Sequence, residues 1–282
     1  MPHEQMFSNM QGQHDRPQTE ARPVTAPRSQ KTIGLTLAIF GALLLTPDTL
    51  FMRLSQLDGF NMLLWRGGLS GLAYFIIWLW VRGPRDLSNI WTRNFAIIVA
   101  CQTGNAALFS LAIALAPVIV VLIGVATVPI FAALLSRLLL GEALSMRTLI
   151  TAAMVFLGLF ISVLGSEDGH LMLDLTTLIG AGLGLGVAFS LAMNFTIIRK
   201  DTDVPFVLAI AVGAIAAAGL AAVFATTLAW PPLPQMAAIA LTGIFILPLS
   251  FVTLSYAARF VPSSTVSLIM LLETVLGPLC VW

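Results

Sequence analysis

Long apolar stretches separated by short polar breaks fill the chain from residue 33 onward. The stretches occupy residues 33–52, 61–81, 94–115, 118–139, 147–165, 175–198, 204–228, 236–257 and 263–282. A helix that crosses the hydrocarbon core of a bilayer needs about 20 mostly apolar residues. Because each stretch approaches that length, the pattern predicts nine membrane-spanning helices. The breaks are short turns, so consecutive helices are predicted to run antiparallel with no soluble domain between them.

The composition agrees with lipid as the main solvent of this chain. Of its 282 residues, 58% are hydrophobic and 10% are charged, whereas soluble globular proteins carry about 25% charged residues. The mean hydropathy is +0.96, so we expect an all-α membrane protein. Residues 1–30 are polar instead and are expected to form a disordered cytoplasmic tail. They contain no apolar core of the kind found in secretory signal peptides.

The basic residues predict the orientation of the helices. If the N-terminus is cytoplasmic and the segments alternate sides, the cytoplasmic segments hold 12 of the 14 Lys and Arg residues. These are Arg16, Arg22, Arg28, Lys31, Arg82, Arg85, Arg93, Arg137, Arg147, Arg199, Lys200 and Arg259. An excess of Lys and Arg marks the cytoplasmic side of membrane proteins. We therefore expect a multi-pass protein of the cytoplasmic (inner) membrane with its N-terminus in the cytoplasm.

A sparse internal repeat relates the two halves of the chain. At offsets of 146 and 145 residues, the aligned identical pairs include Ile33 and Ile179, Gly34 and Gly180, Arg53 and Arg199, Ser110 and Ser255, and Pro117 and Pro262. One repeat interval holds five predicted helices, an odd number, so the second copy enters the bilayer from the opposite side. Inverted repeats of this kind are typical of secondary transporters, with the substrate site between the halves.

The same repeat predicts the domain organisation. Residues 31–166 form a first unit of five transmembrane helices, and residues 171–282 form a second unit of four. The position 145 residues beyond Glu142 lies past Trp282. We therefore expect a bundle of two inverted five-helix repeats that is truncated here after the ninth of ten helices.

The region from the fourth to the fifth predicted helix carries three motifs: PIFAAL (residues 129–134), LGEALS (residues 140–145) and Gly158 in the fifth predicted helix. At these residues, most specifically, the sequence resembles the EamA family of the drug/metabolite transporter (DMT) superfamily. Motif residues to which the resemblance gives a structural role are Pro117, Pro129, Gly141, Glu142 and Pro262. The resemblance implies two five-helix units, a central cavity, and export or exchange of small metabolites such as amino acids. The second unit has Glu273–Thr274 where the family often has Glu-Pro.

Three charged residues within predicted spans are candidates for substrate binding or coupling. Asp48 follows Pro47 in the first span, Arg66 lies near the outer end of the second, and Glu273 lies near the middle of the ninth. Charged groups at membrane depth cost about 2.5–3.5 kcal/mol on insertion scales, so they are expected to face the bundle interior. Asp48 is interpreted as a protonation or substrate site, or as a hydrated residue near Arg53. Arg66 is interpreted as a partner of Asp48, a substrate ligand, or a side chain that reaches the headgroups. Glu273 is the best candidate for proton coupling, and its alternative is a neutral, hydrogen-bonded residue.

Buried polar side chains add further candidates. Asn105 and Asn194, with Gln102, are expected to hydrogen-bond either a substrate or a neighbouring helix. No histidine lies in a predicted span, so we expect neither a histidine-ligated metal nor a histidine proton relay. The expected partners are the lipid bilayer and a small-molecule substrate. A homodimer is allowed, and neither a cofactor nor nucleic acid is expected.

These features favour a secondary active transporter that works by alternating access. A polytopic channel or an intramembrane enzyme remains as the alternative. An enzyme is disfavoured because the sequence holds no HExxH, GxSxG or Asp-rich diphosphate motif. ATP-driven transport would need a partner ATPase, because no GxxxxGK motif is present.

Overall fold

The computed structural model describes residues 28–81, 87, 89–143, 146, 150, 151, 153, 154, 157, 175–225, 228 and 230–281. These residues form helices and connecting turns, with no strand among them, as the apolar pattern predicts. The helices are α2 (Arg28–Leu45), α3 (Asp48–Leu54), α4 (Gly59–Val81), α5 (Arg93–Leu115), α6 (Val118–Val125), α7 (Val128–Leu140), α9 (Leu175–Lys200), α10 (Phe206–Phe224), α11 (Leu233–Ala240), the π-helical segment η2 (Leu241–Ile246), α12 (Leu247–Phe260) and α13 (Ser263–Val281).

Seven helical stretches in the described part of the chain are long and apolar enough to cross a membrane. They are Ser29–Leu54, Gly59–Val81, Arg93–Leu115, Val118–Leu140, Leu175–Lys200, Phe206–Phe224 and Leu233–Phe260. A shorter apolar helix covers Ser263–Leu272, within the ninth predicted span. The prediction of an all-α, multi-pass membrane protein is therefore confirmed. Most of the fifth predicted span, most of the predicted tail and the boundary between the predicted units lie outside the described residues. Helix α2 begins at Arg28, inside the range predicted as tail.

Three of the spans are interrupted near their middle, each beside a proline. The first span breaks at Thr46–Pro47, between α2 and α3. The fourth breaks between α6 and α7, where Thr127 donates its hydroxyl to the Gly124 carbonyl at 2.7 Å, just before Pro129. In the eighth, the π-helical turn of η2 precedes Pro248. Proline removes a backbone donor and frees a carbonyl, which explains why regular α-helix fails at these points.

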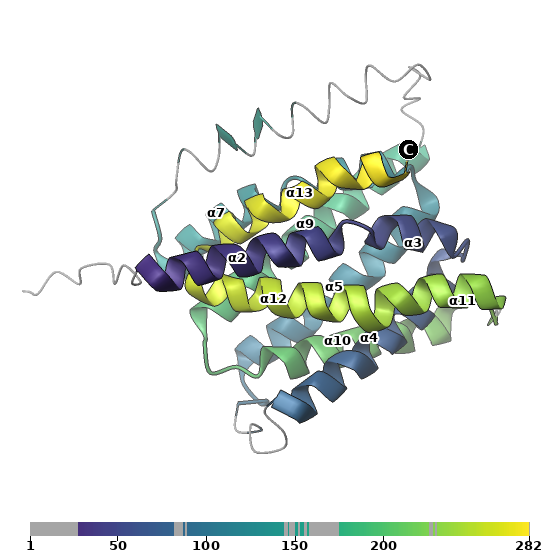
Figure 1. Ribbon diagram of the computed structural model, residues 1–282, viewed down its shortest axis with the longest axis horizontal. Helices are drawn as coiled ribbons and strands as arrows, with labels where there is room; N and C mark the ends of the chain where they lie inside the picture. The colour runs from purple at the N-terminus through teal and green to yellow at the C-terminus, as the bar shows by residue number, and fades with distance from the viewer. Residues whose placement is uncertain are drawn as a thin grey trace, which may run out of the picture.

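The helices pack in a reciprocal pattern across the bundle. Helix α4 lies along α10, α5 lies along α9, and α12 lies along α2 (Figure 1). Helices α6 and α7 also pack on α9, while α13 packs on both α2 and α7. Each of these pairs joins one helix before residue 143 to one after residue 175, so among the described residues the two halves of the chain pack extensively on each other.

Small residues bring several backbones close together. A methyl group built on Gly124 of α6 would lie 2.8 Å from the Cα atom of Gly184 in α9. On α4, a methyl group built on Gly71 would lie 3.2 Å from the carbonyl oxygen of Ala211 in α10. Such contacts are typical of membrane bundles, where helix association depends on close packing because lipid is as apolar as the side chains.

Candidate functional site

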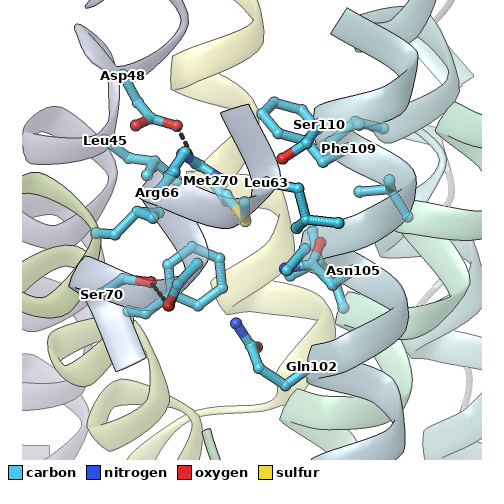
Figure 2. Close-up of a pocket in the computed structure, with 17 residues that line it drawn as sticks. Leu45, Asp48, Leu63, Arg66, Ser70, Gln102, Asn105, Phe109, Ser110 and Met270 are labelled. Carbon is cyan, nitrogen blue, oxygen red and sulfur yellow. Dashed lines mark hydrogen bonds and ion pairs between the residues drawn. The ribbon is translucent and has the colours of Figure 1, made fainter. Parts of the chain in front are cut away.

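A pocket lies between the two halves of the chain, at the level of the helix breaks. It encloses about 580 Å³ of space between its lining atoms, part of it open to solvent. Among the described residues, its polar lining comes from the first half of the chain, from Asp48, Arg66, Ser70, Gln102, Asn105 and Ser110. Apolar side chains of both halves, among them Phe109, Leu191, Phe251 and Met270, complete the wall. Figure 2 shows Asp48 and Arg66 toward one end of this pocket and Gln102 at the other.

All three helix breaks meet at this pocket. Leu45 is the last residue of α2, Val125 is the last of α6, and Leu247 is the first of α12 after the π-helical segment, and each of them lines the pocket. Irregular backbone at membrane depth is tolerated where it is buried in protein or lines a cavity. The three breaks therefore lie where the structure has a cavity, as that rule expects.

Asp48 and Arg66 form a buried ion pair in the pocket. Asp48 is 1% exposed and Arg66 is 6% exposed. The Arg66 guanidinium donates to Oδ2 of Asp48 at 2.5 Å and lies 5.6 Å from the centroid of the Phe109 ring. Arg66 therefore does not reach the headgroups, and Asp48 pairs with Arg66 rather than with the exposed Arg53.

The pair keeps unused hydrogen-bonding capacity. Oδ1 of Asp48 and Nε of Arg66 are buried and find no hydrogen-bond partner among the described residues. A buried polar atom without a partner costs about 1–3 kcal/mol, and more when the group is charged. The ion pair thus holds one buried acceptor and one buried donor that no described residue uses.

The amide side chains extend the polar surface deeper into the bundle. Asn194 of α9 donates its amide to Oε1 of Gln102 in α5 at 3.3 Å, which links the two halves. Asn194 does not line the pocket itself, and its Oδ1 has no partner in the described part of the chain. Asn105 and Gln102 do line the pocket. Of the five residues proposed for substrate binding or coupling, the structure therefore places Asp48, Arg66 and Asn105 in the pocket.

The fifth candidate, Glu273, belongs to α13, but its side chain lies outside the described residues. Its role as a coupling group remains a prediction. Met270, about one helical turn earlier in α13, lines the pocket.

The family-motif residues lie at helix ends, away from the pocket. Gly141 ends α7 in the left-handed conformation, with φ of 70°, which favours glycine. Glu142 accepts hydrogen bonds from Arg199 at 2.7 and 2.8 Å. Pro117 and Pro262 begin α6 and α13 in the same way, each accepting from the backbone amides three and four residues later. Pro129 stands in the first turn of α7.

Ser70, Phe109, Ser110 and Met270 line the pocket but were not singled out from the sequence. For Ser110 a signal existed, because the repeat aligns it with Ser255. Both hydroxyls are buried without a partner among the described residues. The other three side chains give no signal in one sequence, because serine, phenylalanine and methionine are common in membrane helices.

Within the described residues, no group of three or more His, Cys, Asp or Glu side chains could hold a metal ion.

Comparison with solved structures places the fold among known ones. A crystal structure described only as that of a protein has a TM-score of 0.72 and 19% sequence identity, covering 89% of this chain and 86% of its own. At that identity the likeness shows the fold alone. No curated protein matches the chain.

Comparison with family sequence models gives a match over residues 32–164 to the EamA-like transporter family. The matched range contains Asp48, Arg66 and Asn105, together with the PIFAAL and LGEALS segments. Residues 32–164 therefore resemble the EamA-like transporter family, which supports a relation of this chain to the drug/metabolite transporter superfamily.

Proposed function

We propose that this protein is a secondary active transporter that exports or exchanges small metabolites by alternating access. The observation that carries this proposal is the pocket between the halves. It combines a buried ion pair with unpartnered donors and acceptors and an otherwise apolar wall. Ligand sites typically have such mostly apolar walls with a few convergent polar groups.

The helix contacts support an inverted-repeat relation between the halves. The predicted repeat equates α2–α3 with α9, α4 with α10, and α5 with α11–α12. If each helix is replaced by its equivalent in the other half, the contact between α5 and α9 becomes a contact between α12 and α2. Both contacts are present. The contact of α4 with α10 maps onto itself. A two-fold arrangement of this kind lets one unit rock against the other around a fixed site.

The ion pair supports a zwitterionic substrate, such as an amino acid. The unpartnered Oδ1 of Asp48 can accept from an ammonium group, and the unpartnered Nε of Arg66 can donate to a carboxylate. An apolar substituent would then face Phe109, Leu191 or Phe251. Because the two protein charges cancel, a substrate with cancelling charges adds no net charge to the buried site.

Proton coupling is assigned to Asp48 and Glu273. Protonation of Asp48 would remove its attraction for Arg66 and free the guanidinium for a substrate. Glu273→Gln is expected to abolish the pH dependence of transport. Normal, proton-dependent transport by that variant would show that the coupling group lies elsewhere.

The test is transport by the full chain in proteoliposomes, with a panel of amino acids and nucleobases. Counterflow distinguishes a carrier from a channel, because only a carrier gives a transient overshoot of labelled substrate when the vesicles are preloaded with unlabelled substrate. Asp48→Asn is expected to lower the initial rate by about 10- to 100-fold, since a hydrogen bond to a charged group contributes about 1.5–3 kcal/mol.

Asp58→Asn is the matched control, because Asp58 is an exposed carboxylate in the turn before α4, outside the pocket. It should transport at the wild-type rate. If both variants retained full activity, the pocket would not be the substrate site. If substrates equilibrated without an overshoot, alternating access would be refuted.

A further inference from the structure

A second pocket lies at the opposite end of α4 from the Asp48–Arg66 pair. It holds about 380 Å³ of space, part of it open to solvent, between the last turns of α4, the start of α10 and the last turns of α12. Its wall is formed mainly by Ile77, Trp78, Val81, Phe206, Tyr256 and Arg259. In Figure 1, the ends of α4 and α12 and the start of α10 lie at the same end of the bundle. The pocket therefore lies where the spans meet a short polar link, at residues 201–205.

Arg259 is held in a fixed position within this wall. Its guanidinium lies 4.7 Å from the centroid of the Phe206 ring and 5.8 Å from that of Tyr256. It also donates to the carbonyl oxygen of Val204 at 3.1 Å. The carboxylate of Asp201, on the same link, accepts hydrogen bonds from Asn94 at 2.7 Å and from the amide of Asp203 at 3.2 Å. The guanidinium of Arg259 thus lies in the wall of an apolar pocket, near the end of α12.

Trp78 supplies a second donor to the same wall. The side chain is 5% exposed, and its Nε1 is buried with no hydrogen-bond partner among the described residues. A buried tryptophan normally finds a partner for this N–H group. Leaving it without one costs about 1–3 kcal/mol. Trp78 is therefore a pocket-lining residue with a donor that no described residue uses.

The pocket borders surface that faces lipid. On α4, Ile76, Leu79 and Trp80 are exposed, with Trp80 88% exposed. Leu249 of α12 and Phe245 of η2 are exposed as well. In a membrane-spanning bundle, such apolar surface contacts acyl chains. A molecule in this pocket can therefore have its polar part near Arg259 and its apolar part in the bilayer.

We propose that this pocket binds an anionic phospholipid of the surrounding bilayer. The phosphate lies at Arg259 and Trp78, and the glycerol and the first acyl methylenes lie along Ile77, Val81 and Val252. Arginine and an N–H donor match phosphate oxygens, and basic pockets between transmembrane helices are known to hold lipid head groups. The apolar wall favours a lipid over free phosphate, because a free ion would leave that wall unused. This proposal does not depend on the transported substrate.

The test is native mass spectrometry of the full chain, delipidated in detergent and titrated with phosphatidylglycerol or with phosphatidylcholine. The wild type is expected to retain one phosphatidylglycerol at concentrations where phosphatidylcholine is lost. Arg259→Gln should weaken retention about 10-fold or more, as expected for the loss of a charged hydrogen bond. Trp78→Phe keeps an aromatic ring and removes the N–H, and should weaken it about 2- to 10-fold.

Two controls separate the pocket from general effects of charge and surface. Trp80→Phe alters an exposed tryptophan on the same helix, and Arg53→Gln removes an exposed charge at the end of α3. Both should bind phosphatidylglycerol as the wild type does. Equal retention of the two lipids by the wild type would overturn the proposal, and so would competition by soluble glycerol 1-phosphate alone. If Arg259→Gln failed to fold, unchanged binding by Trp78→Phe would overturn it.

Discussion

The crossing of α6 and α9 can be tested with two glycines that lie two residues apart in α9. A methyl group added at Gly184 would lie 2.7 Å from the carbonyl oxygen of Val121 and 3.2 Å from the Cα atom of Gly124. At Gly182, nothing lies within 4 Å of the added methyl group. Both glycines stand inside the same long helix, so alanine changes the intrinsic helix propensity by a similar amount at each.

The magnitude follows from two opposing effects. Replacing glycine by alanine within a helix stabilises it by about 0.5–1 kcal/mol, because the unfolded chain loses conformational freedom. Overpacking costs about 1–3 kcal/mol when the contacting atoms are backbone and cannot rotate away. The propensity effect cancels in the comparison of the two variants. Gly184→Ala should therefore be less stable than Gly182→Ala by about 1–3 kcal/mol.

The measurement is the free energy of unfolding in mixed micelles with increasing SDS, read from tryptophan fluorescence. Gly182→Ala should equal or exceed the wild type in stability. Gly219→Ala in α10, which also has nothing within 4 Å, provides a second control. If Gly184→Ala proved as stable as Gly182→Ala, then α6 and α9 do not approach as closely as described, and the packing of the two halves would need revision.

Three further predictions concern ion pairs and a helix cap. Arg66→Met together with Asp48→Leu should be less destabilising than Asp48→Leu alone, because a buried charge left without its partner costs about 3–5 kcal/mol; SDS unfolding of the three variants checks this. Glu142→Gln should cost less than about 1 kcal/mol by the same assay, since its partly exposed pair with Arg199 is screened by solvent. Burial alone would raise the pKa of Asp58, but hydrogen bonds from the Asn61 side chain and the α4 amides outweigh it and lower the pKa. The stability from this cap is present above the ordinary carboxyl pKa and is lost as the pH falls through the lowered value. Melting temperatures between pH 7 and pH 3 should therefore converge for wild type and Asp58→Asn; a constant gap would contradict the cap.

The spans could be predicted from the sequence because each is a local property. An apolar run of about 20 residues has few alternatives to a membrane helix, and the breaks at Pro47, Pro129 and Pro248 follow from the missing amide of proline. The contact between Asp48 and Arg66 could also be predicted, because charged residues within membrane spans tend to pair with one another.

The shape of the pocket could not be predicted in the same way. The pocket forms where three helix breaks meet, at Leu45, Val125 and Leu247. Their meeting depends on how the three helices cross, and no single segment of the sequence determines that crossing. The hydrogen bond between Gln102 and Asn194 depends on the register of α5 against α9. That register is set by close contacts of small residues such as Gly184, and a single sequence does not reveal which small residues face a neighbour.

The cancelling charges of Asp48 and Arg66 have a consequence for energetics across the bilayer. Moving one elementary charge through a potential of 100 mV changes the free energy by about 2.3 kcal/mol. An ion pair that moves as a unit carries no net charge, so its movement contributes almost nothing to this free energy. The conformational change that returns the unloaded protein should therefore depend little on voltage at the Asp48–Arg66 pair. Any measured current should then come from the transported substrate and from the ion transported with it.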